Sequence, residues 1–282
     1  MTGVLENKKR HRFNFRGSLC IPYAVFMVLF VIIPLGLIFF YAFTDPQGHF
    51  TLTNWRDIFA SPEKWQVIGI TFLIALATTF FCILIAYPIA LILSNSKLNK
   101  NKVLVYIFLL PMWINFVVRT MGLKDLLNGV THLLFNFDLT AKYPLVAIII
   151  GMVYDYLPFA ILPLYNQMLK MDKNQIEAAA DLGANPFTVF YKVIIPMTVP
   201  GIISACMMTF MPTMSSYVIA YHMSNGKTSI IGTLIEFYIN SGSNGYNPGS
   251  VLSLVMLFII GISLLVEKLL DKKDDSRKEG IW

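Results

Sequence analysis

The sequence predicts an all-α integral membrane protein with six transmembrane helices, and three observations carry this prediction. Hydrophobic residues make up 56% of the 282 residues, and the mean hydropathy is +0.64. Charged residues make up only 13%, about half of the share usual in soluble domains. The apolar residues also gather in six runs, each close to the roughly 20 residues that a helix needs to cross a bilayer. The length suits a single membrane domain.

The six predicted spans are residues 19–43, 67–94, 103–118, 145–165, 197–221 and 250–270. The first run follows a basic segment, residues 1–18, and contains no charge between Arg16 and Asp45. A basic start is also typical of a signal peptide, but this run is too long and no small-x-small cleavage site precedes Asp45. We therefore expect the first span to remain as an uncleaved anchor.

Prolines interrupt three of the later spans. Pro111 breaks the short third span, two prolines lie in the fourth, and Pro200 and Pro212 lie in the fifth. A proline frees a backbone carbonyl that must find a partner away from lipid. We therefore expect the kink at Pro111 to face protein or water.

The distribution of lysine and arginine predicts which side of the membrane each loop faces. With the N-terminus inside, the inside segments hold five basic residues before the first span, three in the second loop, three in the loop of residues 166–196 and five near the C-terminus. These are 16 of the 22 lysines and arginines. Both termini, including a tail over residues 271–282, are thus expected to be cytoplasmic. The protein is expected to be a multi-pass protein of the cell membrane.

A short polar stretch, residues 172–186, lies between the fourth and fifth spans, and we call it the elbow. Asp172 can cap a first helix, and Gly183 suits the left-handed residue that ends one. Asn185 can cap a second helix, with Pro186 at its first position. Such an elbow on the cytoplasmic face favours docking of a soluble partner.

The residues of the elbow resemble a family signature. Glu177, Ala178 and Ala179, then Gly183, then Ile195-Pro196 are similar to the EAA motif of permease subunits of type I ABC importers. The resemblance implies the MetI-like permease fold, with a permease core over residues 67–270 and a coupling loop over residues 166–196 that docks on the ATPase. It implies coupling roles for these residues: Glu177, Ala178, Ala179, Asp181 and Gly183. The physics agrees, because small alanines allow close approach and Glu177 offers a charge to a basic partner.

The match extends beyond the elbow to residues 111–115, Arg119, and residues 122–124, 157–159, 163–165 and 195–202. These residues resemble the PotB-type subunits of spermidine/putrescine importers, which implies transport of polyamines. It also implies that the chain works in the lipid bilayer with three partners: a homologous second permease, an ATPase dimer and an extracytoplasmic polyamine-binding protein. An importer of the same architecture for iron, thiamine or an oxyanion remains the alternative.

Candidates for the solute pathway come from residue chemistry alone. Asp155 is the only carboxylate in the apolar part of a predicted span, and a charge there is a functional candidate. Tyr154 and Tyr156 flank it and offer the aromatic faces that attract ammonium groups. Successive helical residues point about 100° apart, so the three side chains cannot face one lumen. The alternative is a structural Asp155, paired with Arg119 or with a partner subunit.

Trp113, Asn115 and Arg119 gather near the break at Pro111. They are further pathway candidates, because the break is expected to face protein or water. The alternative is that Trp113 and Arg119 anchor the third span at the membrane interface.

Several other function classes fit the sequence poorly. No basic face with interleaved aromatics indicates nucleic-acid binding. The four histidines and three cysteines form no metal-ligand pattern, and no catalytic motif of a membrane enzyme is present. Gly226-Lys227-Thr228 lacks the earlier glycine of a phosphate-binding loop, because position 221 is tyrosine. We therefore expect no cofactor and no catalytic residue, with ATP hydrolysis in another chain. A secondary transporter would need paired broken helices with ligands for a coupling ion. Six spans with one intramembrane carboxylate fit this class poorly.

Overall fold

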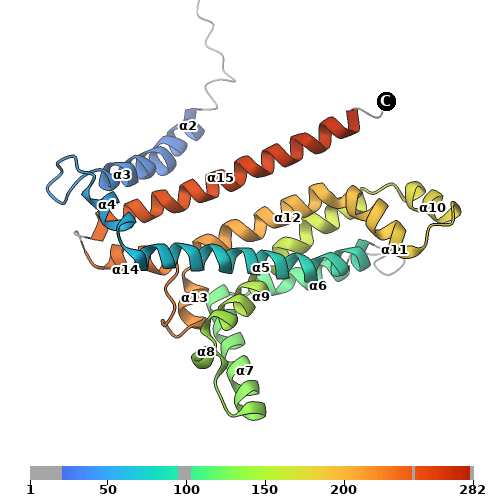
Figure 1. Ribbon diagram of the computed structural model, residues 1–282, viewed down its shortest axis with the longest axis horizontal. Helices are drawn as coiled ribbons and strands as arrows, with labels where there is room; N and C mark the ends of the chain where they lie inside the picture. The colour runs from blue at the N-terminus through green and yellow to red at the C-terminus, as the bar shows by residue number, and fades with distance from the viewer. Residues whose placement is uncertain (1–20, 95–102, 243–244, 280–282) are drawn as a thin grey trace, which may run out of the picture.

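The computed structural model describes residues 21–94, 103–242 and 245–279, and every regular element among them is helical. The long helices lie roughly along one direction, with α10 and α11 at one end and α4 and α14 at the other, while α7 projects from the side (Figure 1). The basic N-terminal segment and the lysines of the second loop lie outside the described residues.

The apolar helices form most of the bundle. They are α2 (Ile21–Met27), α3 (Ile33–Ala42), α5 (Pro62–Ser94), α6 (Val103–Leu109), α9 (Pro144–Leu169), α12 (Ile195–Ser215) and α15 (Tyr246–Glu279). Three short turns extend them, namely the π-helical η1 (Val28–Ile32), the 3-10 turn η2 (Leu110–Trp113) and the π-helical η3 (Phe190–Ile194). The connecting helices are α4 (Thr53–Phe59), α7 (Phe116–Phe135), α8 (Leu139–Lys142), α10 (Lys173–Asp181), α11 (Pro186–Val189), α13 (Val218–Met223) and α14 (Ile231–Asn240).

Within the described ranges, five helical segments are long and apolar enough to cross a membrane. A sixth span is reached when the bent pair Val103–Trp113 and Phe116–Phe135 is counted as one. The all-helical membrane class is thus confirmed, with five to six spans. The helices also exceed the predicted spans at several ends: α5 begins at Pro62, and α15 continues to Glu279, through most of the predicted tail.

The third span is broken near Pro111, as expected, but its predicted end at residue 118 is wrong, because α7 continues to Phe135. The helix ends at Trp113, and the chain turns by 94° into α7. Pro111 lies in the 3-10 turn, Ile114 is extended, and Asn115 caps α7 by accepting the N–H groups of Val117 and Val118 at 2.9 and 3.4 Å. A hydropathy window records composition along the chain, so it misses this change of direction.

The predicted end of the fifth span at residue 221 is also wrong. The helix α12 ends at Ser215, where the backbone of Ser216 becomes extended. The next helix, α13, begins only at Val218. Here α14 packs against the end of α12, where Gly232 lies close to the carbonyl oxygens of Ser215 and Ser216. The apolar residues after Ser215 therefore belong to a separate short helix.

The core of the bundle forms where α5, α9 and α12 pack against one another. The inner face of α5 carries small residues three or four positions apart, and all are buried: Ala75, Thr79, Cys82, Ala86 and Ala90. In a membrane, small side chains at this spacing let helices approach closely. The same three helices therefore form a closely packed unit that positions the sites described below.

Gly201 lies where α9 and α12 approach each other closely. A Cβ atom at this position would lie 2.6 Å from Cβ of Gln167, an atom fixed by its own backbone. We expect Gly201→Ala to lower the free energy of unfolding by about 1–3 kcal/mol, because the helices must separate. The measurement is the thermal unfolding of the purified protein in detergent.

The matched control for this prediction is Gly261→Ala in α15, where a Cβ atom would meet nothing within 4 Å. That change should be neutral or slightly stabilising, because alanine favours a helix over glycine. Equal unfolding midpoints for the two variants would contradict the close crossing.

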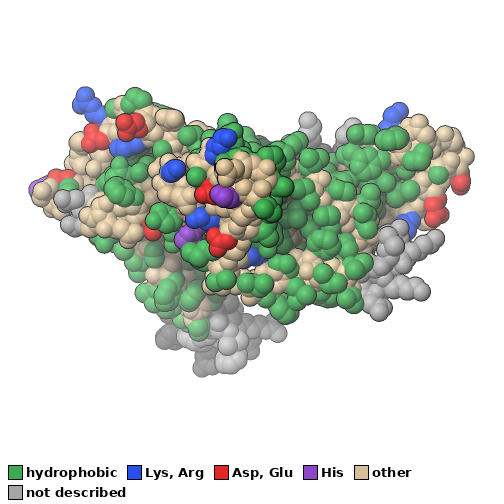
Figure 2. Space-filling view, turned by 90° about the horizontal axis from the view of Figure 1, so that it is seen from below, with side chains coloured by type: hydrophobic (Ala, Val, Ile, Leu, Met, Phe, Trp, Pro, Cys, Tyr) green, Lys and Arg blue, Asp and Glu red, His purple; other side chains and the backbone are tan. Residues whose placement is uncertain are grey.

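The surface of the bundle is largely apolar. Figure 2 shows hydrophobic side chains over most of the face seen from below, with charged side chains in the centre and towards the two ends. So large an exposed apolar surface is typical of a protein that faces lipid or partner subunits along its sides.

Candidate functional site

The elbow folds as the local sequence predicts. The Asp172 carboxylate accepts the Asn174 N–H at 3.0 Å, and the Asn185 side chain accepts the Thr188 N–H at 2.7 Å. Gly183 has φ +83°, a value that side chains with a Cβ atom rarely adopt. The predicted caps and the glycine break are therefore confirmed.

The turn at Gly183 closes α10 with two backbone hydrogen bonds. The N–H of Gly183 donates to the carbonyl of Ala180 at 2.9 Å, and the N–H of Ala184 donates to that of Ala179 at 3.1 Å. This pair is the Schellman arrangement, which satisfies carbonyls at a helix end. The elbow is thus a defined structure and not a loose loop.

The elbow is also almost fully exposed. None of the nine residues of α10 is buried in the isolated chain, and Glu177 and Asp181, four residues apart, share one face. Two large apolar side chains beside them are solvent-exposed, Leu182 by 89% and Phe187 by 77%. An exposed surface of two carboxylates and two apolar side chains suits a partner with basic and apolar groups.

Specific contacts tie the elbow to the bundle. The helices α11, η3 and α12 are continuous, so α12 carries the elbow directly. Gln167 Nε2 of α9 donates to the Met197 carbonyl at 3.0 Å, and the hydroxyls of Tyr87 in α5 and Thr198 in α12 are 2.9 Å apart. A displacement of the elbow would therefore reach α5, α9 and α12 together.

A buried ion pair lies between α7 and α9. Arg119 Nε donates to Asp155 Oδ1 at 2.5 Å, and the two side chains are 8% and 2% exposed. The Thr120 hydroxyl lies 2.8 Å from Asp155 Oδ2 and 2.8 Å from the Phe116 carbonyl. The single hydroxyl hydrogen favours the carboxylate, because hydrogen bonds to charged acceptors are stronger. Both oxygens of Asp155 are thus occupied.

The same arginine closes the break in the third span. Arg119 Nη1 donates to the Pro111 carbonyl at 2.8 Å, and Nη2 lies 3.5 Å from the Asp155 carbonyl. The Tyr154 ring covers the guanidinium, with 5.5 Å between the ring centroid and Cζ. The break therefore faces protein, and Arg119 joins η2, α7 and α9 at one point.

The other pathway candidates lie around this cluster. Tyr156 points elsewhere and donates its hydroxyl to the Pro212 carbonyl of α12 at 3.3 Å. Trp113 is 85% exposed, and the Asn115 side chain is used as the cap of α7. The structure thus brings Arg119, Tyr154 and Asp155 together and leaves the other three candidates apart.

Sequence reasoning did not identify Thr120, Leu182 or Phe187. Thr120 is 35 residues from Asp155, and no spacing in a single sequence links the two. Leu182 and Phe187 are apolar residues beside Gly183 and Pro186, and their position in a polar loop was the available signal for exposure.

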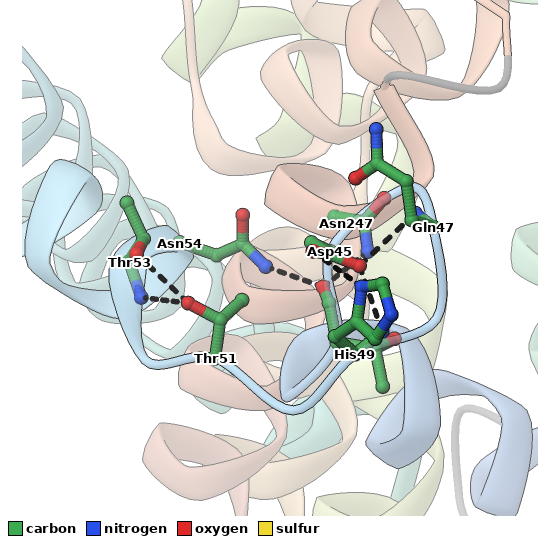
Figure 3. Close-up of polar contacts among 8 residues, drawn as sticks. Asp45, Gln47, His49, Thr51, Thr53, Asn54 and Asn247 are labelled. Atoms are coloured by element: carbon green, nitrogen blue, oxygen red, sulfur yellow. Dashed lines mark hydrogen bonds and ion pairs between the residues drawn. The ribbon is translucent and has the colours of Figure 1, made fainter.

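The loop between α3 and α4 lies at the end of the bundle opposite to the elbow (Figure 1). Asp45 Oδ1 accepts the N–H groups of Gln47 and His49 at 3.0 and 2.8 Å, and Asp45 Oδ2 lies 3.4 Å from His49 Nδ1 (Figure 3). Asn54 and Asn247 donate to the Thr44 carbonyl at 2.8 and 2.5 Å. The loop is thus closed on itself and fastened to α4 and α15.

The pKa of Asp45 lies below its ordinary value, chiefly because the His49 N–H donates to the carboxylate. A lowered pKa stabilises the folded loop above the unfolded value of about 3.9, and this contribution is lost as the pH falls through the folded value. We expect the His49 amide to resist hydrogen exchange equally between about pH 5 and 8, and to lose protection only at pH values below the ordinary aspartate pKa of about 3.9. Exchange mass spectrometry measures this, and protection in Asp45→Ala equal to wild type would contradict it.

Comparison with known proteins identifies clear relatives, although no family model matches the chain. A spermidine/putrescine transport system permease protein PotB of Haemophilus influenzae is 33% identical over 267 residues, covering 88% of this chain and 92% of that protein. The protein of the same name in Escherichia coli K12 is 30% identical over 266 residues, covering 88% and 96%. A PotB homolog of Mycoplasma pneumoniae is 32% identical over 233 residues, covering 81% and 80%.

Solved structures share the fold. A chain of the bacterial alginate ABC transporter, in complex with an alginate pentasaccharide-bound periplasmic protein, matches with a TM-score of 0.73 at 14% identity, covering 92% of this chain and 94% of that one. A chain of the inward-facing MetNI methionine ABC transporter matches with a TM-score of 0.54 at 18% identity, covering 76% and 98%. The helical arrangement is therefore that of ABC importer permeases.

Proposed function

The chain belongs to the PotB family of ABC importer permeases, and we propose that its own solute is a polyamine, spermidine or putrescine. It is a multi-pass membrane subunit that contributes to transport and performs no chemistry itself. The single observation that carries the proposal is 33% identity across 88% of the chain to a permease whose name states spermidine/putrescine transport.

The proposed complex has three kinds of partner. An ATPase dimer binds on the cytoplasmic side, a homologous second permease completes the pathway in the membrane, and an extracytoplasmic binding protein delivers the polyamine. In the proposed topology both termini are cytoplasmic. In Figure 1 the C-terminal ends of α5 and α15 lie towards the same end of the bundle as the elbow, and the loop between α3 and α4 lies at the opposite end. This arrangement supports the proposed side for the C-terminus.

The elbow is the proposed coupling element within the loop of residues 166–196. Glu177 and Asp181 are proposed to meet basic groups of the ATPase, while Ala178 and Ala179 allow close approach and Gly183 sets the turn. The Schellman turn and the two side-chain caps support this role, because a defined element transmits a displacement without deforming. Closure of the ATPase dimer would then move α12, and with it α5 and α9.

The solute pathway is proposed to pass the cluster of Arg119, Tyr154 and Asp155. A polyamine carries several widely spaced ammonium groups, which aromatic faces and carboxylates attract. Tyr154 is exposed, and its ring covers the Arg119 guanidinium, which pairs with the Asp155 carboxylate. Trp113 adds an exposed aromatic face near the break, while Tyr156 and Asn115 would support the surrounding helices.

Uptake of labelled spermidine by cells that express the whole complex tests the proposal. The comparison is with the same cells lacking this chain, and the competitors are unlabelled putrescine, iron, thiamine and an oxyanion. We expect saturable uptake that requires the chain and that putrescine inhibits. If the ATPase co-purifies with the chain but no polyamine enters, the importer architecture stands and the polyamine proposal fails.

A further inference from the structure

We propose that the groups around the Arg119 guanidinium form a binding site for an alkylammonium or guanidinium cation, and that Arg119 plugs this site until a solute cation displaces it. We call this site the cation cage and define it by Pro111, Tyr154 and Asp155. The inference extends the proposed polyamine transport and rests on it, because the displacing cation is the solute.

The cage consists of groups that suit a cation in general. Asp155 Oδ1 and the Pro111 carbonyl lie 2.5 and 2.8 Å from guanidinium nitrogens, and the Asp155 carbonyl lies at 3.5 Å. The Tyr154 ring closes one side at 5.5 Å. Two carbonyl oxygens, a carboxylate and a ring face also satisfy the N–H groups of a primary ammonium.

A second contact besides that of Arg119 holds the Asp155 carboxylate. Thr120 holds Asp155 Oδ2 at 2.8 Å, so the position of the carboxylate depends on α7 and α9 and not on the guanidinium alone. A buried carboxylate without a counter-ion is strongly unfavourable. Exchange of one cation for another avoids this state, because the carboxylate remains paired before and after.

The cage has a route for the exchange. Tyr154 is 42% exposed and covers the guanidinium, while the side chains of Arg119 and Asp155, which pair with each other, are 8% and 2% exposed. A cation that approaches the exposed ring therefore meets Arg119 first and the carboxylate second. The arginine side chain is long and flexible, so it can leave the cage without movement of its helix.

Displacement of Arg119 would also release the broken span. The Arg119 bond to the Pro111 carbonyl links α7 to η2 across the extended residue Ile114. When the guanidinium leaves, this link is lost. Occupancy by a solute cation thus loosens the junction of α6 and α7, which couples binding to a change of shape in the span.

Equilibrium binding of labelled spermidine to the purified whole complex, without the binding protein, tests the cage. We expect Arg119→Met to bind spermidine at least about tenfold more tightly than wild type, because no guanidinium must be displaced. The double variant Arg119→Met with Asp155→Leu should lose this gain. Arg56→Met, at an exposed arginine of α4, is the matched control and should bind as wild type does.

A second variant, Arg119→Lys, keeps the proposal testable if the complex with Arg119→Met does not assemble. A lysine ammonium can pair with Asp155 but lacks the fork that also reaches Pro111, so this variant should assemble and bind spermidine more tightly than wild type. Binding no tighter than wild type in either single variant overturns the proposal, because a permanent structural ion pair predicts that result.

The proposed function fails separately from the cage. If wild-type cells take up no polyamine, the polyamine proposal fails. Binding of labelled methylguanidinium to the purified complex then tests the cation cage. Arg119→Met should bind this ion, whereas the Arg119→Met, Asp155→Leu double variant should not. If wild-type cells take up spermidine but Arg119→Met gains no affinity, only the cage proposal fails.

Discussion

Replacing Glu177 with lysine is expected to lower solute uptake at least about 30-fold while the protein still inserts in the membrane. Glu177 is exposed on α10, so the fold tolerates the change. A reversed charge at a partner's basic surface costs about 2–5 kcal/mol, which corresponds to a loss of this size or more. The measurement is uptake in cells, with the membrane level of the chain determined in parallel.

The control for this variant is Asp57→Lys. Asp57 is also an exposed carboxylate, but it lies on α4 at the end of the bundle away from the elbow. Uptake should be unchanged there, and the ATPase should co-purify with Asp57→Lys but poorly with Glu177→Lys. Normal uptake by Glu177→Lys would remove the elbow from the coupling mechanism.

The second large effect is expected at the buried ion pair. Asp155→Leu leaves the Arg119 guanidinium buried without a counter-ion, and removing one member of such a pair costs about 3–5 kcal/mol. For a protein of this size the unfolding midpoint should fall by on the order of 10 °C. Fluorescence-monitored thermal unfolding of the purified protein in detergent measures the shift.

The double variant Arg119→Met with Asp155→Leu separates the ion pair from local packing. Apolar residues of similar volume often replace a buried pair without loss of stability. We therefore expect the double variant to regain most of the midpoint that Asp155→Leu loses. A double variant as unstable as the single one would mean that packing around Asp155, and not its charge, stabilises this region.

The elbow could be predicted from sequence in detail, because its determinants are local. Each cap joins residues two or three positions apart, and Gly183 is the residue type that its backbone angle favours. The hydropathy of a span also depends only on residues close together in the sequence, so the predicted apolar segments lie close to the observed helices. Interactions between residues so close in the sequence can be predicted without knowledge of the rest of the fold.

The cation cage and the two wrong span ends could not be predicted in this way. Pairing of Asp155 with Arg119 was one of two open alternatives, because a single sequence does not show which residues 36 positions apart will meet. The 94° turn after Trp113 is made by an extended residue and a helix cap. The same local sequence is also compatible with a mild kink in a span that continues in one direction. Ser215 ends α12 where α14 packs against it, a contact between distant segments.

The most direct test of the account is ATP-driven accumulation of labelled spermidine in liposomes that contain the purified complex and its binding protein. The account predicts accumulation against the spermidine gradient that requires ATP and this chain and that Glu177→Lys abolishes. ATP hydrolysis without spermidine accumulation, or equal accumulation without ATP, would contradict it.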